Sequence, residues 1–128
     1  MKNIYFLVLF FLSLTSCMTT KNGGVISSPQ EYWNKQPDLS KVVYSGGDGS
    51  SIENAIIINN AENERNGVAA EYDYIAKKQG VKFTDWKPAG QSTIIEKDKR
   101  YDIVTIEIIS KKEKLTLYFD ITSFYGKW

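Results

Sequence analysis

The sequence predicts a single α+β domain over residues 42–128, with an antiparallel sheet of about four strands (β-α-β-β-β) and one helix packed on one face. Ile56-Ile57-Ile58 is a β-branched run typical of a buried strand. Residues 68–79 have apolar positions at helical spacing, and Gly80 can end that helix. After Gly80 the apolar period falls to two, and residues 104–121 alternate as strands do.

The helix is predicted to bury one stripe of side chains. This stripe consists of Val68, Tyr72, Ile75, Ala76 and Gln79, with Ala69 beside it. Asn59 is the predicted N-cap because Glu62 follows it at the spacing of a capping box. Asn66-Gly67 interrupts the pattern and can split off a first turn.

Short strands and turns surround the helix. Val42 to Tyr44 can form a brief strand, and the glycine-rich segment 45–51 is predicted to be a structural turn. A phosphate loop would need a following Lys-Ser/Thr, and a calcium loop would need carboxylates at alternate positions, whereas this segment has one Asp. Residues 81–86 alternate as a strand, residues 88–90 interrupt it, and residues 92–96 resume it.

The last two strands are predicted to form a hairpin around a four-residue loop, Lys111–Lys114. In this register the buried pairs are Ile108 with Leu117, Ile106 with Phe119 and Val104 with Ile121. The other face then carries Glu107 beside Tyr118 and Thr105 beside Asp120. Asp120→Ala is therefore expected to be nearly silent for folding, whereas Phe119→Ala should cost about 3–5 kcal/mol.

Composition excludes several classes of site. The chain has 128 residues, 16 Lys and Arg, 15 Asp and Glu, and no His. Without His there is no Ser-His or Cys-His pair and no imidazole metal ligand. A nearly neutral chain without a basic block also lacks the usual signature of nucleic-acid binding. No metal or cofactor motif is recognised, and the chain is not predicted to be an enzyme.

The N-terminal residues form a pattern of their own. Met1-Lys2-Asn3 is positively charged, and residues 4–14 are an almost unbroken apolar run. Eleven residues are too few to span a bilayer, which takes about 20 helical residues. The run fits the apolar region of a signal peptide. The following Leu14-Thr15-Ser16-Cys17 resembles the lipobox of bacterial lipoproteins.

This resemblance implies that residues 1–16 are a signal peptide and that Cys17 becomes a lipidated N-terminus. Diacylglycerol and N-acyl chains on Cys17 would attach the protein to a membrane. Residues 17–41 would then form a flexible tether and an N-terminal arm. Met18, in place of Asp, favours the outer membrane, with the domain facing the periplasm. An ordinary secretory signal or a buried apolar helix is the alternative.

The domain resembles small exported bacterial proteins that are uncharacterised. The resemblance rests on the string from Asp48 to Ile56, on Ala70-Glu71-Tyr72 and on residues 117–124, and it extends over residues 45 to 126. It implies no activity. Cys17 is the only cysteine, so the chain can form no internal disulfide.

Three functions follow as hypotheses. The first is a binding or accessory module that contacts another envelope protein or a glycan through Tyr118, Tyr125 and Trp128, with Glu107 and Asp120 nearby. The second is a glycan hydrolase that uses Glu107 and Asp120 as its two carboxylates, although these acids are more simply read as solvated positions on an open sheet face. The third is an inhibitor-like or immunity-like domain.

Overall fold

The computed structural model describes residue 30 and residues 34–128, and Lys35–Trp128 forms one compact unit. The predicted signal peptide, Cys17 and residues 18–29 and 31–33 of the predicted tether and arm lie outside the described residues. Within the described part of the chain, no helix is long and apolar enough to cross a membrane.

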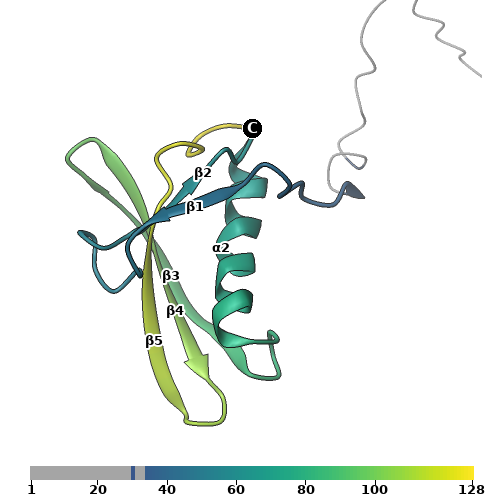
Figure 1. Cartoon of the computed structure of the whole chain (residues 1–128), viewed down its shortest axis with the longest axis vertical. Helices are drawn as coiled ribbons and strands as arrows, with labels where there is room; N and C mark the ends of the chain where they lie inside the picture. Colours follow the sequence, from purple (N-terminus) through teal and green to yellow (C-terminus); the bar gives the residue numbers. More distant parts are fainter. Residues whose placement is uncertain (1–29, 31–33) are drawn as a thin grey trace, which may run out of the picture. The chain divides into compact units, whose positions relative to one another are not determined.

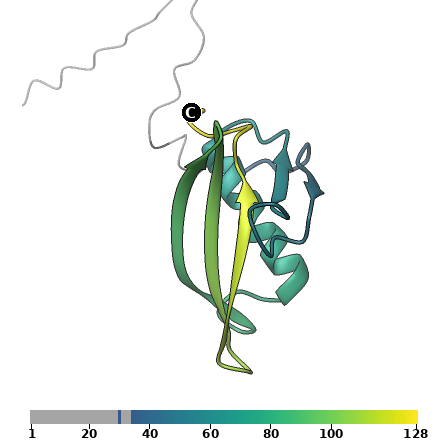
Figure 2. The same ribbon diagram turned by 90° about the vertical axis from the view of Figure 1, so that its left-hand side faces the viewer.

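The fold is α+β, as predicted, but its sheet is mixed and has five strands (Figures 1 and 2). In chain order the elements are β1 (Val43–Gly46), β2 (Ile56–Asn59), α2 (Glu64–Gln79), β3 (Trp86–Glu96), β4 (Lys99–Ile108) and β5 (Glu113–Asp120). The strand order in the sheet is β1-β2-β5-β4-β3, and only the β2–β5 pair is parallel. The purely antiparallel four-stranded prediction was wrong because β2 pairs with a strand that comes last in the sequence.

The glycine-rich segment after β1 is a packed turn. Gly49 takes a φ of +81°, and its carbonyl accepts a hydrogen bond from the Tyr118 amide at 2.9 Å. A Cβ on Gly49 would lie 2.6 Å from Cδ1 of Ile56, so only glycine allows this approach. The prediction of a structural turn is confirmed for residues 47–51. The predicted strand 42–44 is observed as β1 over Val43–Gly46, so Ser45 and Gly46 belong to the strand.

Helix α2 begins one turn later than predicted. Its N-cap is Asn63, whose side chain accepts a hydrogen bond from the Asn66 amide at 2.9 Å. Asn59 ends β2 instead, and Asn60 takes a φ of +61°, which turns the chain before the helix starts. Gly80 is the C-cap, as predicted, and its amide donates to the Ala76 carbonyl.

The buried side of α2 matches the predicted stripe only in part, since Ile75 is buried and Tyr72 packs against the core. Gly67, Ala70, Glu71 and Ile75 are buried, whereas Ala76 is exposed and Val68 is 38% exposed. Asn66-Gly67 lies within the helix and does not split it. Because Gly67 and Ala70 are small, this side of the helix packs closely against its neighbours. The close packing favours burial of this side over burial of the side that carries the larger Val68.

Residues 81–85 form a turn, not the predicted strand. The amide of Asp85 donates to the Val81 carbonyl at 2.8 Å, and β3 starts only at Trp86. The interruption predicted at residues 88–90 is present as a register shift between Pro88 and Gly90. The strand then continues to Glu96.

The β4–β5 hairpin keeps the predicted faces but not the predicted register. Val104 lies opposite Leu117, Ile106 opposite Leu115 and Ile108 opposite Glu113. The four-residue loop is therefore 109–112, two positions earlier than expected. The Ile109 amide donates to the carbonyl of Asp85, which removes Ile109 from the ladder with β5. Shifting the turn by two positions leaves every side chain on its original face, so the apolar pattern alone cannot distinguish the two registers.

The core lies between α2 and one face of the sheet. Its largest fully buried apolar side chains are Trp86, Phe119, Phe124, Ile56, Ile58, Ile75, Ile106 and Val104. Trp86 stacks on Tyr72, with ring centroids 6.1 Å apart, and its indole nitrogen donates to the Gly80 carbonyl. Of the three tryptophans, Trp86 belongs to the core, Trp128 is 87% exposed, and Trp33 lies outside the described residues.

The contact between Gly67 and Phe124 generates a first prediction. A Cβ on Gly67 would lie 2.2 Å from the Phe124 ring, whereas Gly90 has no atom closer than 4.0 Å. Gly67→Ala should lower the free energy of unfolding by about 1–3 kcal/mol because the core is overpacked. Helix propensity alone predicts a gain of up to about 1 kcal/mol. Urea unfolding measures the sign, with Gly90→Ala as the nearly neutral control; a stabilised Gly67→Ala protein would contradict this packing.

Candidate functional site

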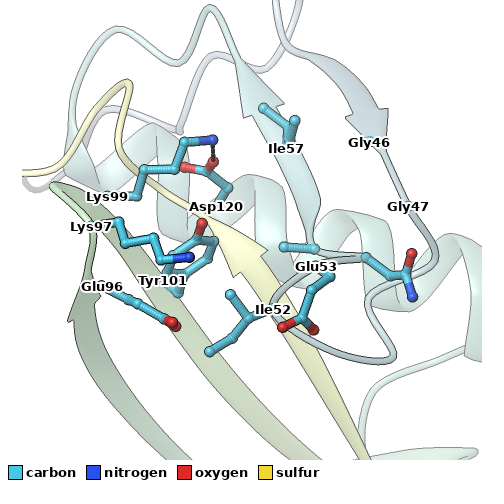
Figure 3. Close-up of a pocket in the computed structure, with 12 residues that line it drawn as sticks. Gly46, Gly47, Ile52, Glu53, Ile57, Glu96, Lys97, Lys99, Tyr101 and Asp120 are labelled. Atoms are coloured by element: carbon cyan, nitrogen blue, oxygen red, sulfur yellow. Dashed lines mark hydrogen bonds and ion pairs between the residues drawn. The ribbon is translucent and has the colours of Figure 1, made fainter.

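A large cavity lies where the two halves of the sheet meet (Figure 3). Its volume is about 530 Å³. The walls come from the end of β1, the loop before β2, the β3–β4 turn and the ends of β4 and β5. The sequence predicted an open sheet face around Asp120, whereas the structure places the 47–55 loop beside the β3–β4 turn and forms a cavity there.

Charged side chains of both signs surround this cavity. Glu53 and Glu96 contribute carboxylates, and Lys97 and Lys99 contribute ammonium groups (Figure 3). Between them lie the apolar side chains of Ile52, Ala55 and Ile57 and the ring of Tyr101, which is buried. The cavity therefore offers an apolar floor with charges at its rim, a combination typical of binding pockets.

Local backbone geometry creates both sides of the cavity. Gly46 has a φ of +84°, and a Cβ there would lie 2.5 Å from the Ala55 carbonyl oxygen. A Cβ on Gly47 would lie 2.4 Å from the Asn54 carbonyl oxygen, so these two glycines let the loop fold back on itself. On the other side, Lys97 and Asp98 both take positive φ, as a two-residue type I′ hairpin turn requires.

Asp120 is the acidic residue at the base of this site. It is buried, and its carboxylate accepts a hydrogen bond from the Thr122 amide at 3.1 Å and lies 3.2 Å from the Lys99 ammonium. Burial acts to raise the pKa of Asp120, but the Thr122 hydrogen bonds and Lys99 outweigh it, so the pKa is lowered. The expectation that Asp120 is a solvated position beside Thr105 was wrong, because Asp120 lies opposite Tyr101 and Thr105 lies opposite Thr116.

The two acids of the hydrolase hypothesis are far apart. Asp120 is paired with Tyr101, whereas Glu107 is paired with Lys114 and forms an ion pair with Lys87 at 3.4 Å. Tyr101, the partner of Asp120, and Glu107 are six positions apart along β4, a distance of about 20 Å. Glycoside hydrolysis needs carboxyl groups about 5–9.5 Å apart, so Glu107 and Asp120 cannot act as that pair.

The three aromatic residues predicted to bind a partner lie at separate places in the structure. Tyr118 is half-buried on β5 opposite Ile103. Tyr125 lies 5.5 Å from the Arg100 guanidinium and lines a separate cavity of about 210 Å³. Trp128 projects from a C-terminal segment that folds back on α2, where the Glu64 amide donates to the Lys127 carbonyl. Of the five predicted binding residues, only Asp120 lines the large cavity.

A buried acid lies between α2 and β4, away from the large cavity. Glu71 is fully buried, and neither of its carboxyl oxygens has a hydrogen-bond partner among the described residues. Burial, and then the charge of Asp102, raises the pKa of Glu71 to about 9. Asp102 accepts hydrogen bonds from Gln91 and Thr93. Glu71 is therefore a neutral carboxylic acid at pH 7.

Sequence reasoning missed most of the residues that line the large cavity. Glu53, Lys97, Lys99 and Tyr101 come from a loop and a hairpin turn that are more than 40 positions apart. Lys97 and Asp98 take positive φ, but the sequence there lacks the Asn-Gly pair that usually indicates such a turn. The one usable signal was the glycine-rich segment, which was recognised as a turn but not as a cavity wall.

A scan against protein-family models finds no match, and searches of the curated proteins and of the solved structures find no significant match.

The environment of Asp120 generates a second prediction. Asp120→Ala should lower the free energy of unfolding by about 1–3 kcal/mol at pH 7, because the Thr122 amide and Lys99 lose their acceptor. A lowered pKa means that this contribution is present above the ordinary pKa of 3.8 and is lost as the pH falls through the folded value. The difference between variant and parent should therefore shrink in acid. Glu96→Ala, at an exposed position, is the control; equal effects of both changes would contradict the assignment.

The buried acid generates a third prediction. Between pH 4.5 and about 9 the folded protein keeps a proton on Glu71 that the unfolded chain has released, so stability falls as pH rises. The fall is about 1.4 kcal/mol per pH unit, or about 3 kcal/mol by pH 7. Glu71→Gln should flatten this slope and be more stable than the parent at pH 8.

Chemical unfolding at several pH values measures this slope. The exposed Glu113→Gln should keep the parental pH dependence. An unchanged slope in Glu71→Gln would show that Glu71 is ionised in the folded state.

Proposed function

We propose that this protein is a lipid-anchored binding module of the bacterial cell envelope, attached through Cys17 to the outer membrane and facing the periplasm. The lipobox-like sequence before Cys17 supports the anchor. The large cavity, with its apolar floor and charges of both signs, is the observation that carries the binding function.

The chemistry of the cavity favours binding over catalysis. A general acid for hydrolysis needs a carboxyl group with a raised pKa. The pKa of Asp120 is lowered, and the pKa of Glu53 is lowered by hydrogen bonds from its own amide and from Ser51. The acid with a strongly raised pKa, Glu71, is fully buried and does not line the cavity.

A peptide segment of another envelope protein fits the cavity better than a glycan does. Glycan sites present exposed aromatic faces, whereas the ring of Tyr101 is 7% exposed. A peptide supplies side chains of both charges and apolar groups between them, which matches the carboxylates of Glu53 and Glu96 and the ammonium groups of Lys97 and Lys99 around the cavity.

The anchor is tested by Cys17→Ser. This change removes the thiol that would carry diacylglycerol, so the protein should move from the membrane fraction to the soluble fraction and lose labelling by a palmitate analogue. Thr15→Ala keeps a small residue in the motif and should leave both unchanged. Membrane retention of Cys17→Ser would contradict lipid anchoring.

The binding site is tested by photo-crosslinking in intact cells. A photoreactive residue at Lys97, on the rim of the cavity, should give a discrete adduct with one envelope protein, whereas the same residue at the exposed Ser92 should not. Glu53→Lys should reduce the adduct several-fold, and the distant Glu113→Lys should not. Equal adducts at Lys97 and Ser92 would count against the cavity as the binding site.

A further inference from the structure

The α2–β3 turn presents two apolar side chains to solvent. Val81 is 63% exposed and Phe83 is 72% exposed. In Figures 1 and 2 this turn lies at the same end of the domain as the β4–β5 turn, far from the C-terminus. The Ile109 amide donates to the Asp85 carbonyl at 2.9 Å and connects the two turns. We call the segments 77–87 and 107–114 the basic end of the domain.

Phe83 has an unfavourable backbone conformation as well as an exposed ring. Its φ is +66°, a value that glycine and asparagine adopt readily and that is a steric outlier for a bulky residue. Its amide donates to the Trp86 carbonyl, which holds the turn in this shape. The ring is mostly exposed and its contact with the Lys82 ammonium is on the surface, so little burial offsets this strain. Such outliers concentrate at functional sites.

Lysines surround this apolar pair. The basic end contains seven of them, Lys77, Lys78, Lys82, Lys87, Lys111, Lys112 and Lys114, all of them exposed. Lys77 and Lys87 form ion pairs with Asp73 and Glu107, whereas the other five form no ion pair within residues 34–128.

The acidic residues do not neutralise the basic end. It contains three of them, Asp85, Glu107 and Glu113, and the Asp85 carboxylate already accepts a hydrogen bond from the Val81 amide. Besides the neutral Glu71, the remaining described residues include seven basic and ten acidic side chains. The domain is thus electrically polar although its sequence is nearly neutral.

We infer that the basic end docks on an anionic phospholipid bilayer. Phe83 and Val81 would enter the boundary between headgroups and acyl chains, and the lysines would contact lipid phosphates. Lys82 suits this role because its ammonium lies 4.4 Å from the Tyr72 ring centroid and 5.2 Å from that of Phe83, so it lies beside the apolar pair. The bilayer relieves the exposure of Phe83, which a soluble polyanion cannot do.

The inference rests on the proposed function in one respect, because a lipid anchor on Cys17 would keep the domain close to a membrane. It does not use the cavity. Docking would hold the domain in one orientation on the membrane surface, with the cavity at the opposite end of the sheet free for a partner.

Vesicle binding without the lipid anchor tests the inference. The chain from residue 17 onward, with Cys17→Ser, contains the whole compact unit Lys35–Trp128 and has no thiol to acylate. It is sedimented with vesicles of phosphatidylcholine alone and with vesicles containing about one quarter phosphatidylglycerol. Binding should require phosphatidylglycerol and should weaken when salt is raised from about 0.1 M to 0.5 M.

Two variants separate the apolar and electrostatic contributions. Phe83→Asn should weaken vesicle binding by about tenfold or more, with an unfolding midpoint equal to or higher than that of the parent because asparagine tolerates positive φ. Lys111→Glu with Lys112→Glu should weaken binding by about 30-fold. Ile95→Asn, and Lys35→Glu with Lys127→Glu, are matched controls outside the basic end and should bind as the parent does.

Three results would overturn the inference. One is equal binding to both vesicle compositions, or to neither. Another is normal vesicle binding by Phe83→Asn, which would mean that the lysines bind polyanions in general. Heparin binding, measured on the same proteins, identifies that case. The third is equal weakening by the control variants, which would indicate a non-specific charge effect.

Discussion

The short parallel pairing of β2 with β5 is the contact on which the rest of the fold depends. It consists of two residue pairs, Ile56 with Phe119 and Ile57 with Asp120, and it joins the β1–β2 hairpin to the three-stranded β3–β4–β5 sheet. Closing a loop of more than 60 residues costs chain entropy, which the burial of Ile56 and Phe119 offsets. Ser123 strengthens the junction because its hydroxyl donates to the Ile58 carbonyl at 2.7 Å.

The same junction positions the candidate site. Ile57 and Asp120 are partners in the pairing, and both line the large cavity. Because only two pairs form, the strands diverge beyond them, and the 47–55 loop and the β3–β4 turn stand on either side of the opening (Figure 3). A longer parallel ladder would close this space. The cavity thus follows from the small extent of the contact that holds the sheet together.

The fold also separates charges that the sequence mixes. Lysines from α2, the α2–β3 turn and the β4–β5 turn gather at one end because α2 runs alongside the sheet and both turns end there (Figure 1). The acids are in excess elsewhere, and one of them, Glu71, is buried without a charge partner. A neutral total charge excludes a strongly basic chain, but it says nothing about a basic surface.

Local sequence patterns predicted the features that local forces determine. The α+β class, the end of α2 at Gly80 and the buried faces of β4 and β5 follow from periodicity and from the backbone freedom of glycine. The start of α2 was predicted less well, because both Asn59 and Asn63 can cap a helix and only the turn at Asn60 decides between them. The lipid anchor on Cys17 stays a prediction from the sequence.

Contacts between distant residues decided the rest. Phe124, near the end of the chain, packs on Gly67 and sets which side of α2 is buried. The Ile109 amide donates a hydrogen bond to the Asp85 carbonyl in the observed hairpin register. The predicted register places the same side chains on each face of the sheet. The pairing of β2 with β5 brings Asp120 into the cavity and leaves Glu107 outside it. The sequence by itself determined which residues prefer helix, strand or turn, and the tertiary structure decided which of them meet, because the contacts between distant segments depend on shape and are not encoded in any local period.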